Sequence, residues 1–224
     1  MSRFLSAPYL DDDDDDQPDI PPEPEDPPAP EKDADKSAPG SPVNELESRL
    51  FKGRKVMIFG AINDKLARDV VARILTLAEE TAKPIDIYVN SPGGHVESGD
   101  SIHDVIRFVR DAVPVRMIGT GWVASAGAHI YLGAHKDRRF CLPNTRFLLH
   151  QPLGGITGRA TDIDIEAREI IKMRERLSLI IAAETGQKIE RVRRDTERNY
   201  WMSAEEAIDY GMVTRILKSI TELE

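Results

Sequence analysis

The amino-acid sequence predicts an α/β fold, in which strands and crossover helices alternate along one chain. From "KVMIFG" at residue 55 onward, short apolar runs alternate with amphipathic stretches, the pattern expected when helices connect the strands of one layer. The order of strand, glycine-rich loop and helix then occurs at least twice. With 224 residues, the chain is long enough for one domain of ordinary size.

The first helix of this pattern is predicted over residues 64 to 80, with Asp64 available as an N-terminal cap. Its apolar side chains recur at helical spacing: Leu66, Val70, Ile74 and Leu77. The run "IDIYV" (85–89) predicts a strand, "NSPGGH" (90–95) a turn, and residues 97 to 111 a second helix. The apolar face of that helix comprises Ile102, Val105, Ile106 and Val109.

The same order then repeats. "VRMIG" (115–119) predicts a strand, "TGW" (120–122) a loop, and "VASAGAHIYLGA" (123–134) a helix rich in small residues. "TRFLLH" (145–150) predicts a further strand.

The longest helical pattern covers residues 162 to 184 and ends before Gly186, a typical C-terminal stop. Its apolar positions include Ile163, Ile170, Met173, Leu177 and Ile180. The preceding segment, "QPLGGITGRAT" (151–161), is polar and glycine-rich and need not fold back on its own domain. A long helix after such a segment is suited to an assembly arm.

The N-terminal residues 1–45 form a separate, acidic segment. They hold 14 Asp and Glu against 3 Lys and Arg, and 10 of the 15 prolines. Because this composition cannot bury enough apolar surface to offset the entropy of ordering, we predict a disordered tail and a folded domain over 46–224. The tail is either an interaction or solubility arm or a solvated extension without a partner. The remaining residues carry a net charge of only +2 and no basic block, so nucleic-acid binding is not expected.

The chain is expected to be cytoplasmic. Its first residues contain too short an apolar run for a secretory signal, and no later stretch approaches the roughly 20 apolar residues of a membrane span. The single cysteine, Cys141, allows no internal disulfide, which fits a reducing compartment, and we assign it no role.

Three short motifs have residue types suited to chemistry. Ser125 in "WVASAGA" has small neighbours at a predicted strand-to-helix turn, where free backbone N–H groups could hold an oxyanion; close helix packing is the alternative. His150 ends the run "FLLH" and could act as a general base or be structural, and four other histidines compete for that role: His95, His103, His129 and His135. The glycines of "SPGGH" (91–95) could direct N–H groups at a ligand carbonyl or form a simple turn.

No cofactor is expected in this chain. The histidines lack the spacing of a zinc site and Cys141 has no partner. Neither a GxGxxG nor a Walker pattern is present, so a bound nucleotide is not expected.

Taken in order, eight motifs resemble the proteolytic subunit of the Clp protease family, ClpP, over about residues 46 to 217: "NSPGG", "ASAGA", "RFCLPN", "LLHQPLGG", "TDIDIEAREI", "TGQ", "RDTER" and "MSAEEAIDYG". The resemblance implies a fold similar to the crotonase superfamily, with repeated strand-strand-helix units and a protruding handle over about 151–184. It also implies two stacked seven-membered rings, homomeric or with a paralogous subunit. Such rings enclose a chamber into which a hexameric ATPase feeds unfolded proteins.

The resemblance also assigns roles by position. Ser125 would be the nucleophile, His150 the general base, and the backbone N–H groups of Gly94 and Ala126 the oxyanion donors. An extended substrate would pair with the backbone beside "SPGG". The third catalytic position, an Asp in the family, is Asn199 here. Because Asn supplies no negative charge to the imidazolium, we expect a latent or weakly active peptidase.

A nearby carboxylate and one further departure from the family leave alternatives open. Asp195, one helical turn before Asn199, could substitute for the missing carboxylate. The N-terminal stretch with which the family forms axial pore loops has no recognisable counterpart. One alternative is a structural or regulatory ring subunit that assembles with an active paralogue. Another is a crotonase-type acyl-CoA enzyme, which shares the fold and the oxyanion donors but does not use a serine and histidine pair.

Overall fold

The computed structural model describes residues 42–152 and 157–223. The described residues belong to one compact unit, Ser37–Glu224. The predicted acidic tail lies outside the described residues up to position 41, as do residues 153–156 of the predicted handle. The helix α1 begins at Pro42, a few residues before the predicted domain boundary.

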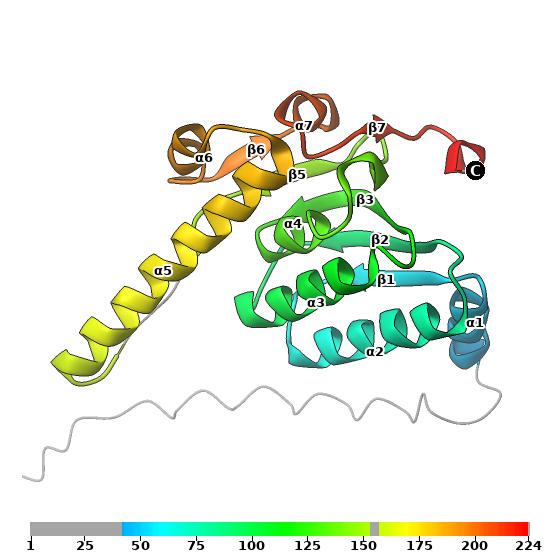
Figure 1. Ribbon diagram of the computed structural model, residues 1–224, viewed down its shortest axis with the longest axis horizontal. Coiled ribbons are helices and arrows are strands. Elements are labelled where there is room, and N and C mark those ends of the chain that lie inside the picture. The colour runs from blue at the N-terminus through cyan, green and yellow to red at the C-terminus, as the bar shows by residue number, and fades with distance from the viewer. Residues whose placement is uncertain (1–41, 153–156, 224) are drawn as a thin grey trace, which may run out of the picture. The chain divides into compact units, whose positions relative to one another are not determined.

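A mostly parallel sheet organises this unit (Figure 1), as the alternating pattern predicts. Five parallel strands pair in the order β1-β2-β3-β4-β7. Their bounds are Lys55–Phe59, Ile85–Ser91, Val115–Ala124, Arg139–Cys141 and Arg215–Ile216. Two more strands branch from the middle of the sheet: β5 (Arg146–Leu149) runs parallel to β3, and β6 (Tyr200–Met202) runs antiparallel to β5. These two strands lie where β3 approaches its C-terminal end.

Helices pack on the sheet and alternate with its strands along the chain. Their bounds are Pro42–Lys52 (α1), Asp64–Glu80 (α2), Val96–Val109 (α3), Ala126–Tyr131 (α4), Ala160–Thr185 (α5), Ile189–Asp195 (α6) and Ala204–Tyr210 (α7). Short 3₁₀ turns span Lys136–Arg138 and Ile220–Leu223. The helices α2, α3 and α4 lie side by side on one side of the sheet (Figure 1), where Ile74, Ile102 and Ile106 are fully buried.

The predicted helix over 64–80 has the predicted bounds, but its cap differs. The side chain of Asn63 accepts a hydrogen bond from the N–H of Leu66 at 2.9 Å, so Asn63 is the N-cap. Asp64 is instead the first helical residue. A carboxylate in this turn still interacts favourably with the helix dipole.

The predicted "TGW" loop is wrong. The strand β3 continues through these residues to Ala124, and α4 begins only at Ala126. The physical reason is a change of partner on one side of β3: Met117 to Gly119 pair with β4 and Trp122 to Ala124 pair with β5, while β2 pairs with both parts of the strand. Gly121 allows the bend between the two halves with a φ of 61°.

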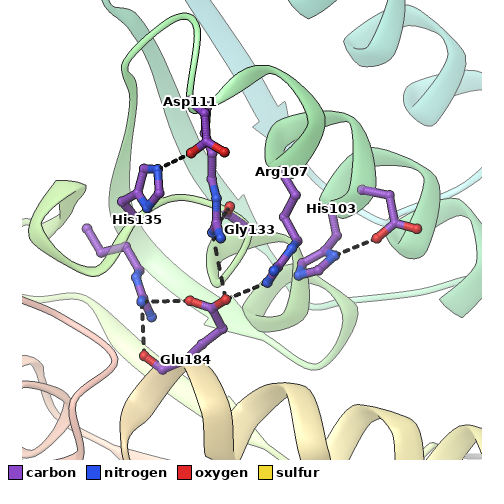
Figure 2. A network of polar contacts seen from close by, with 9 residues as sticks. His103, Arg107, Asp111, Gly133, His135 and Glu184 are labelled. Atoms are coloured by element: carbon purple, nitrogen blue, oxygen red, sulfur yellow. Dashed lines mark hydrogen bonds and ion pairs between the residues drawn. The ribbon is translucent and has the colours of Figure 1, made fainter.

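The longest helix, α5, is held at its C-terminal end (Figure 2). The Glu184 carboxylate forms ion pairs with Arg107 of α3, with Arg110 at the C-cap of that helix and with the fully buried Arg139 at the start of β4; the N–O distances are 2.5, 3.7 and 3.1 Å. Gly186 then ends the helix in the left-handed conformation, as predicted. The N-terminal turns of α5 are exposed and extend away from the sheet (Figure 1).

Candidate active site

Ser125 occupies the sharp turn between β3 and α4. Its φ and ψ of 55° and −122° lie in a region that residues with a side chain rarely adopt. The N–H of Ser125 donates to the carbonyl of Leu148 on β5 at 2.9 Å, which holds the turn against the neighbouring strand. The turn predicted from the small residues around Ser125 is therefore present, and the hydroxyl lies at the C-terminal end of the central strand β3.

His150 lies beside this hydroxyl. It follows β5 directly, and its Nε2 is 2.7 Å from Ser125 Oγ. Its Nδ1 is 3.1 Å from Oδ1 of Asn199, the residue before β6. Because the Asn199 carbonyl oxygen can only accept, it favours the tautomer with the proton on Nδ1 and the lone pair of Nε2 facing Ser125. The structure thus brings together all three side chains that the sequence singled out.

The glycine turn before α3 lies against the serine. A side chain at Gly93 would place its Cβ 2.5 Å from the Cβ of Ser125, so only glycine permits this approach. Within residues 42–152 and 157–223, neither the N–H of Gly94 nor that of Ala126 donates a hydrogen bond. No described residue therefore occupies either amide, and both can donate to a ligand.

A pocket with mostly apolar walls opens beside Ser125 and His150. Its lining includes Val96 of α3, Leu149 at the end of β5 and Leu177 and Ile181 of α5. An apolar side chain next to the reacting carbonyl of a peptide would fit such walls.

A polar cluster that the sequence did not predict lies behind this pocket. His129 of α4 contacts Asp100 of α3 with an Nε2–Oδ1 distance of 2.9 Å, and Arg176 of α5 binds the same carboxylate at 2.7 Å. Burial acts to raise the pKa of Asp100, but the contacts with His129 and Arg176 lower it to about 2. The His103 ring stacks on His129, and burial together with the charge of His129 lowers the pKa of His103 to about 4. These residues come from three helices, so no local motif reveals their contact.

The other candidates lie elsewhere. His135 pairs with Asp111 on the surface (Figure 2), and His95 contacts Asp64 and Glu97. Asp195 binds Arg191 and Arg194, so its carboxylate does not substitute for Asn199 beside His150. Cys141 is buried, and burial raises the pKa of its thiol to about 12.

In the part of the chain that the structure describes, no group of three or more His, Cys, Asp or Glu side chains is arranged to hold a metal ion. None of the helices within 42–152 and 157–223 is long and apolar enough to cross a membrane.

A serine, a histidine and two free amides at the end of a parallel sheet are the features of a hydrolase that forms an acyl intermediate. The Clp protease family model matches residues 39–220, most of the chain. The chain therefore belongs to the Clp protease family, and it is a Clp protease subunit.

Its relatives are similar over most of their length. ATP-dependent Clp protease proteolytic subunit 2 of Gluconobacter oxydans is 66% identical over 211 residues, which cover 94% of this chain and 92% of the relative. Proteolytic subunit 3 of Rhizobium johnstonii is 59% identical over 179 residues, covering 80% and 91%.

Solved structures agree on the fold. ClpP1 from Listeria monocytogenes is 48% identical with a TM-score of 0.72, and an Asn-to-Asp mutant of the same protein is 49% identical with a TM-score of 0.74. Each covers 80% of this chain and 99% of its own. The ClpP fold predicted from the motifs is thus confirmed.

Proposed function

We propose that the protein is the proteolytic subunit of an ATP-dependent serine protease that hydrolyses peptide bonds of unfolded proteins. The observation that carries the proposal is the 2.7 Å contact between Ser125 Oγ and His150 Nε2. This distance is that of a hydrogen bond between a nucleophile and its general base. Membership of the Clp protease family supports the same reaction, and it argues against an acyl-CoA enzyme.

In the proposed mechanism, Ser125 Oγ attacks the substrate carbonyl carbon while His150 Nε2 takes the hydroxyl proton. The oxyanion that forms accepts hydrogen bonds from the N–H groups of Gly94 and Ala126. The imidazolium then gives its proton to the leaving amine, and the C–N bond breaks. Water, activated by His150, hydrolyses the acyl-enzyme and restores Ser125.

Asn199 would orient the imidazole without stabilising its charge. The 3.1 Å contact supports the tautomer that the mechanism needs, with Nδ1–H donating to the Asn199 carbonyl oxygen, but a neutral amide cannot offset the positive charge of the imidazolium. We therefore propose that the subunit is weakly active or latent alone.

A fluorophosphonate probe followed by mass spectrometry tests this assignment. We expect covalent modification at Ser125 and its loss in Ser125→Ala, with a slower rate in His150→Ala. Ser101→Ala, a serine variant on the outer side of α3, serves as the control and should label as the wild type does. Absence of labelling at Ser125, both in the subunit alone and in mixed rings with a paralogue, under conditions that label an active serine hydrolase would refute the proposal.

For assembly, we propose stacked seven-membered rings, homomeric or mixed with a paralogous subunit, that receive unfolded chains from a hexameric ATPase. The exposed apolar side chains of α5, among them Ile165 and Ile171, support an interface along this helix. We also propose a cytoplasmic location, since the single, buried Cys141 is a free thiol. Native mass measurement of the assembly, alone and with a paralogue, tests the ring composition.

A second candidate is a structural or regulatory ring subunit with little chemistry of its own, and Asn199 favours it. The two candidates differ in turnover. If homomeric rings neither label nor hydrolyse peptides, but mixed rings gain activity that survives Ser125→Ala in this chain, the structural role is the correct one.

A further inference from the structure

Asp64, His95 and Ser98 form a side-chain cluster beside the glycine turn, outside the group of Ser125, His150 and Asn199. Asp64 is the first residue of α2, His95 is the N-cap of α3, and Ser98 is in the first turn of α3. The Ser98 hydroxyl is nearly inaccessible to solvent, with 3% of the residue exposed.

Ser98 Oγ connects the other two side chains. It donates to Asp64 Oδ1 at 2.5 Å and lies 2.8 Å from His95 Nδ1. Because its single proton goes to the carboxylate, Ser98 accepts the bond from His95 Nδ1–H. His95 Nδ1 also lies 3.2 Å from Asp64 Oδ1, which closes the triangle. The Ser98 hydrogen bond, followed by the charge of His95, lowers the pKa of Asp64.

The backbone between these side chains includes Gly94. The N–H of Ile62 donates to the carbonyl of Gly93 at 2.9 Å, and the N–H of His95 donates to the carbonyl of Ile62 at 3.0 Å. Gly94 thus lies between the two backbone hydrogen bonds of Ile62, one donated and one accepted, and Ile62 lies two positions before Asp64. A Cβ at Gly94 would approach the carbonyl oxygen of Ile62 to 2.3 Å, so the two segments are in direct contact.

We propose that Asp64, His95 and Ser98 are positioning residues that hold the Gly94 amide at the distance from Ser125 that the oxyanion requires. The inference rests on the proposed proteolytic function, in which Gly94 N–H is an oxyanion donor. The side chains fasten the start of α3 to the start of α2, and the two backbone hydrogen bonds of Ile62 fasten the turn between them.

A small shift of this turn has a large effect on the reaction. Gly93 packs against Ser125 with no room for a Cβ atom between them, and movement of the turn away from the serine would lengthen the hydrogen bond from Gly94 to the oxyanion. Loss of one oxyanion donor slows acyl transfer about 10²- to 10³-fold, and displacement without loss costs less. We expect about a tenfold decrease when the cluster is broken.

The test compares Ser98→Ala and Asp64→Ala with wild type in peptide hydrolysis and in binding of a peptide boronate. The boronate forms a tetrahedral adduct with serine and imitates the oxyanion. Both variants should lower kcat about tenfold with KM nearly unchanged, and the boronate Kd should rise by the same factor. Asp64→Asn, which keeps an acceptor oxygen, should show a smaller decrease in kcat and a smaller rise in the boronate Kd. Asp64 is exposed, so its variants test the inference even if Ser98→Ala does not fold.

Ser101→Ala is the matched control, because Ser101 lies on the same helix and its hydroxyl donates to the carbonyl of Glu97 and not to Asp64. Its kcat and boronate Kd should equal those of the wild type. If wild type binds the boronate and both cluster variants bind it equally well, the positioning role is wrong. If wild type itself neither binds the boronate nor labels at Ser125, the proposed proteolytic function fails instead.

Discussion

Replacing Asn199 with Asp restores a negative charge beside the imidazole. The two groups are 3.1 Å apart, and unit charges at that distance attract by about 5 kcal/mol at an effective dielectric constant near 20 and by about 1.3 kcal/mol at 80. Because residue 199 is exposed, solvent screening places the gain in the lower part of that range. A gain of about 1.5–3 kcal/mol in the transition state corresponds to about a 10- to 100-fold rise in kcat.

The assay is hydrolysis of a fluorogenic peptide by assemblies of equal composition, with kcat and KM determined separately. The carboxylate acts on the imidazolium that forms during the reaction, so the rise should be in kcat with little change in KM. Asn144→Asp adds the same charge at an exposed turn away from His150 and should leave kcat unchanged. Asn199→Ala, which removes the orienting oxygen, should lower kcat.

The outcome for Asn199→Asp separates two accounts of the site. Equal rates for wild type and Asn199→Asp would show that a fixed carbonyl oxygen supplies all that the imidazole needs. The electrostatic reasoning about Asn199 would then be wrong, and the low intrinsic activity proposed from it would lose its basis.

Three further predictions concern residues around the site. Glu184→Ala removes the carboxylate from the fully buried Arg139, so the free energy of unfolding in urea should fall by about 3–5 kcal/mol, whereas equal stability would mean that water replaces the carboxylate. The pKa of His103 is about 4 in the folded protein and near 6.5 in the unfolded protein, so between these values only the unfolded state binds the proton. Lowering the pH from 7 to 5 should therefore reduce the free energy of unfolding by about 2 kcal/mol. An equally large reduction in His103→Phe would contradict this. Gly94 has a φ of 147° and lies against Ile62, so Gly94→Ala should lower kcat at least about 100-fold. Gly60→Ala, with open space around the added Cβ, should leave kcat unchanged. A fully active Gly94→Ala would exclude the Gly94 N–H as a donor to the oxyanion.

Much of the fold follows from periodicity. The helix over 64–80 repeats its apolar residues at helical spacing, and α5 ends at Gly186 because that glycine adopts a left-handed conformation. The end of β3 could not be predicted from Gly121, since a glycine in an extended run indicates a loop and a bend within a strand equally well. Pairing with β5, a partner more than 20 residues later, and with Ser91 of β2 keeps the end of β3 in the sheet.

The contacts of the site depend on long-range pairing in the same way. The motifs single out Ser125 and His150 as residue types, but their approach to 2.7 Å requires the pairing of β3 with β5. The cluster of Asp100, His129 and Arg176 was missed because its members come from three separate helices. Spacing within one element cannot report a contact that forms between elements.

Strand register explains why the three central side chains meet. Ala124 pairs with Leu148 in the parallel ladder of β3 and β5, and Leu149 pairs with Tyr200 in the antiparallel ladder of β5 and β6. Ser125, His150 and Asn199 each lie one residue beyond a paired position, where the backbone leaves the sheet and the side chain is free to turn toward its neighbour. A slip of one residue in either ladder would turn alternate side chains to the opposite face and separate the imidazole from its partners. The chemistry of the site therefore depends on two short strands, and a change that weakens the pairing of β6 should separate Asn199 from His150 before it alters Ser125.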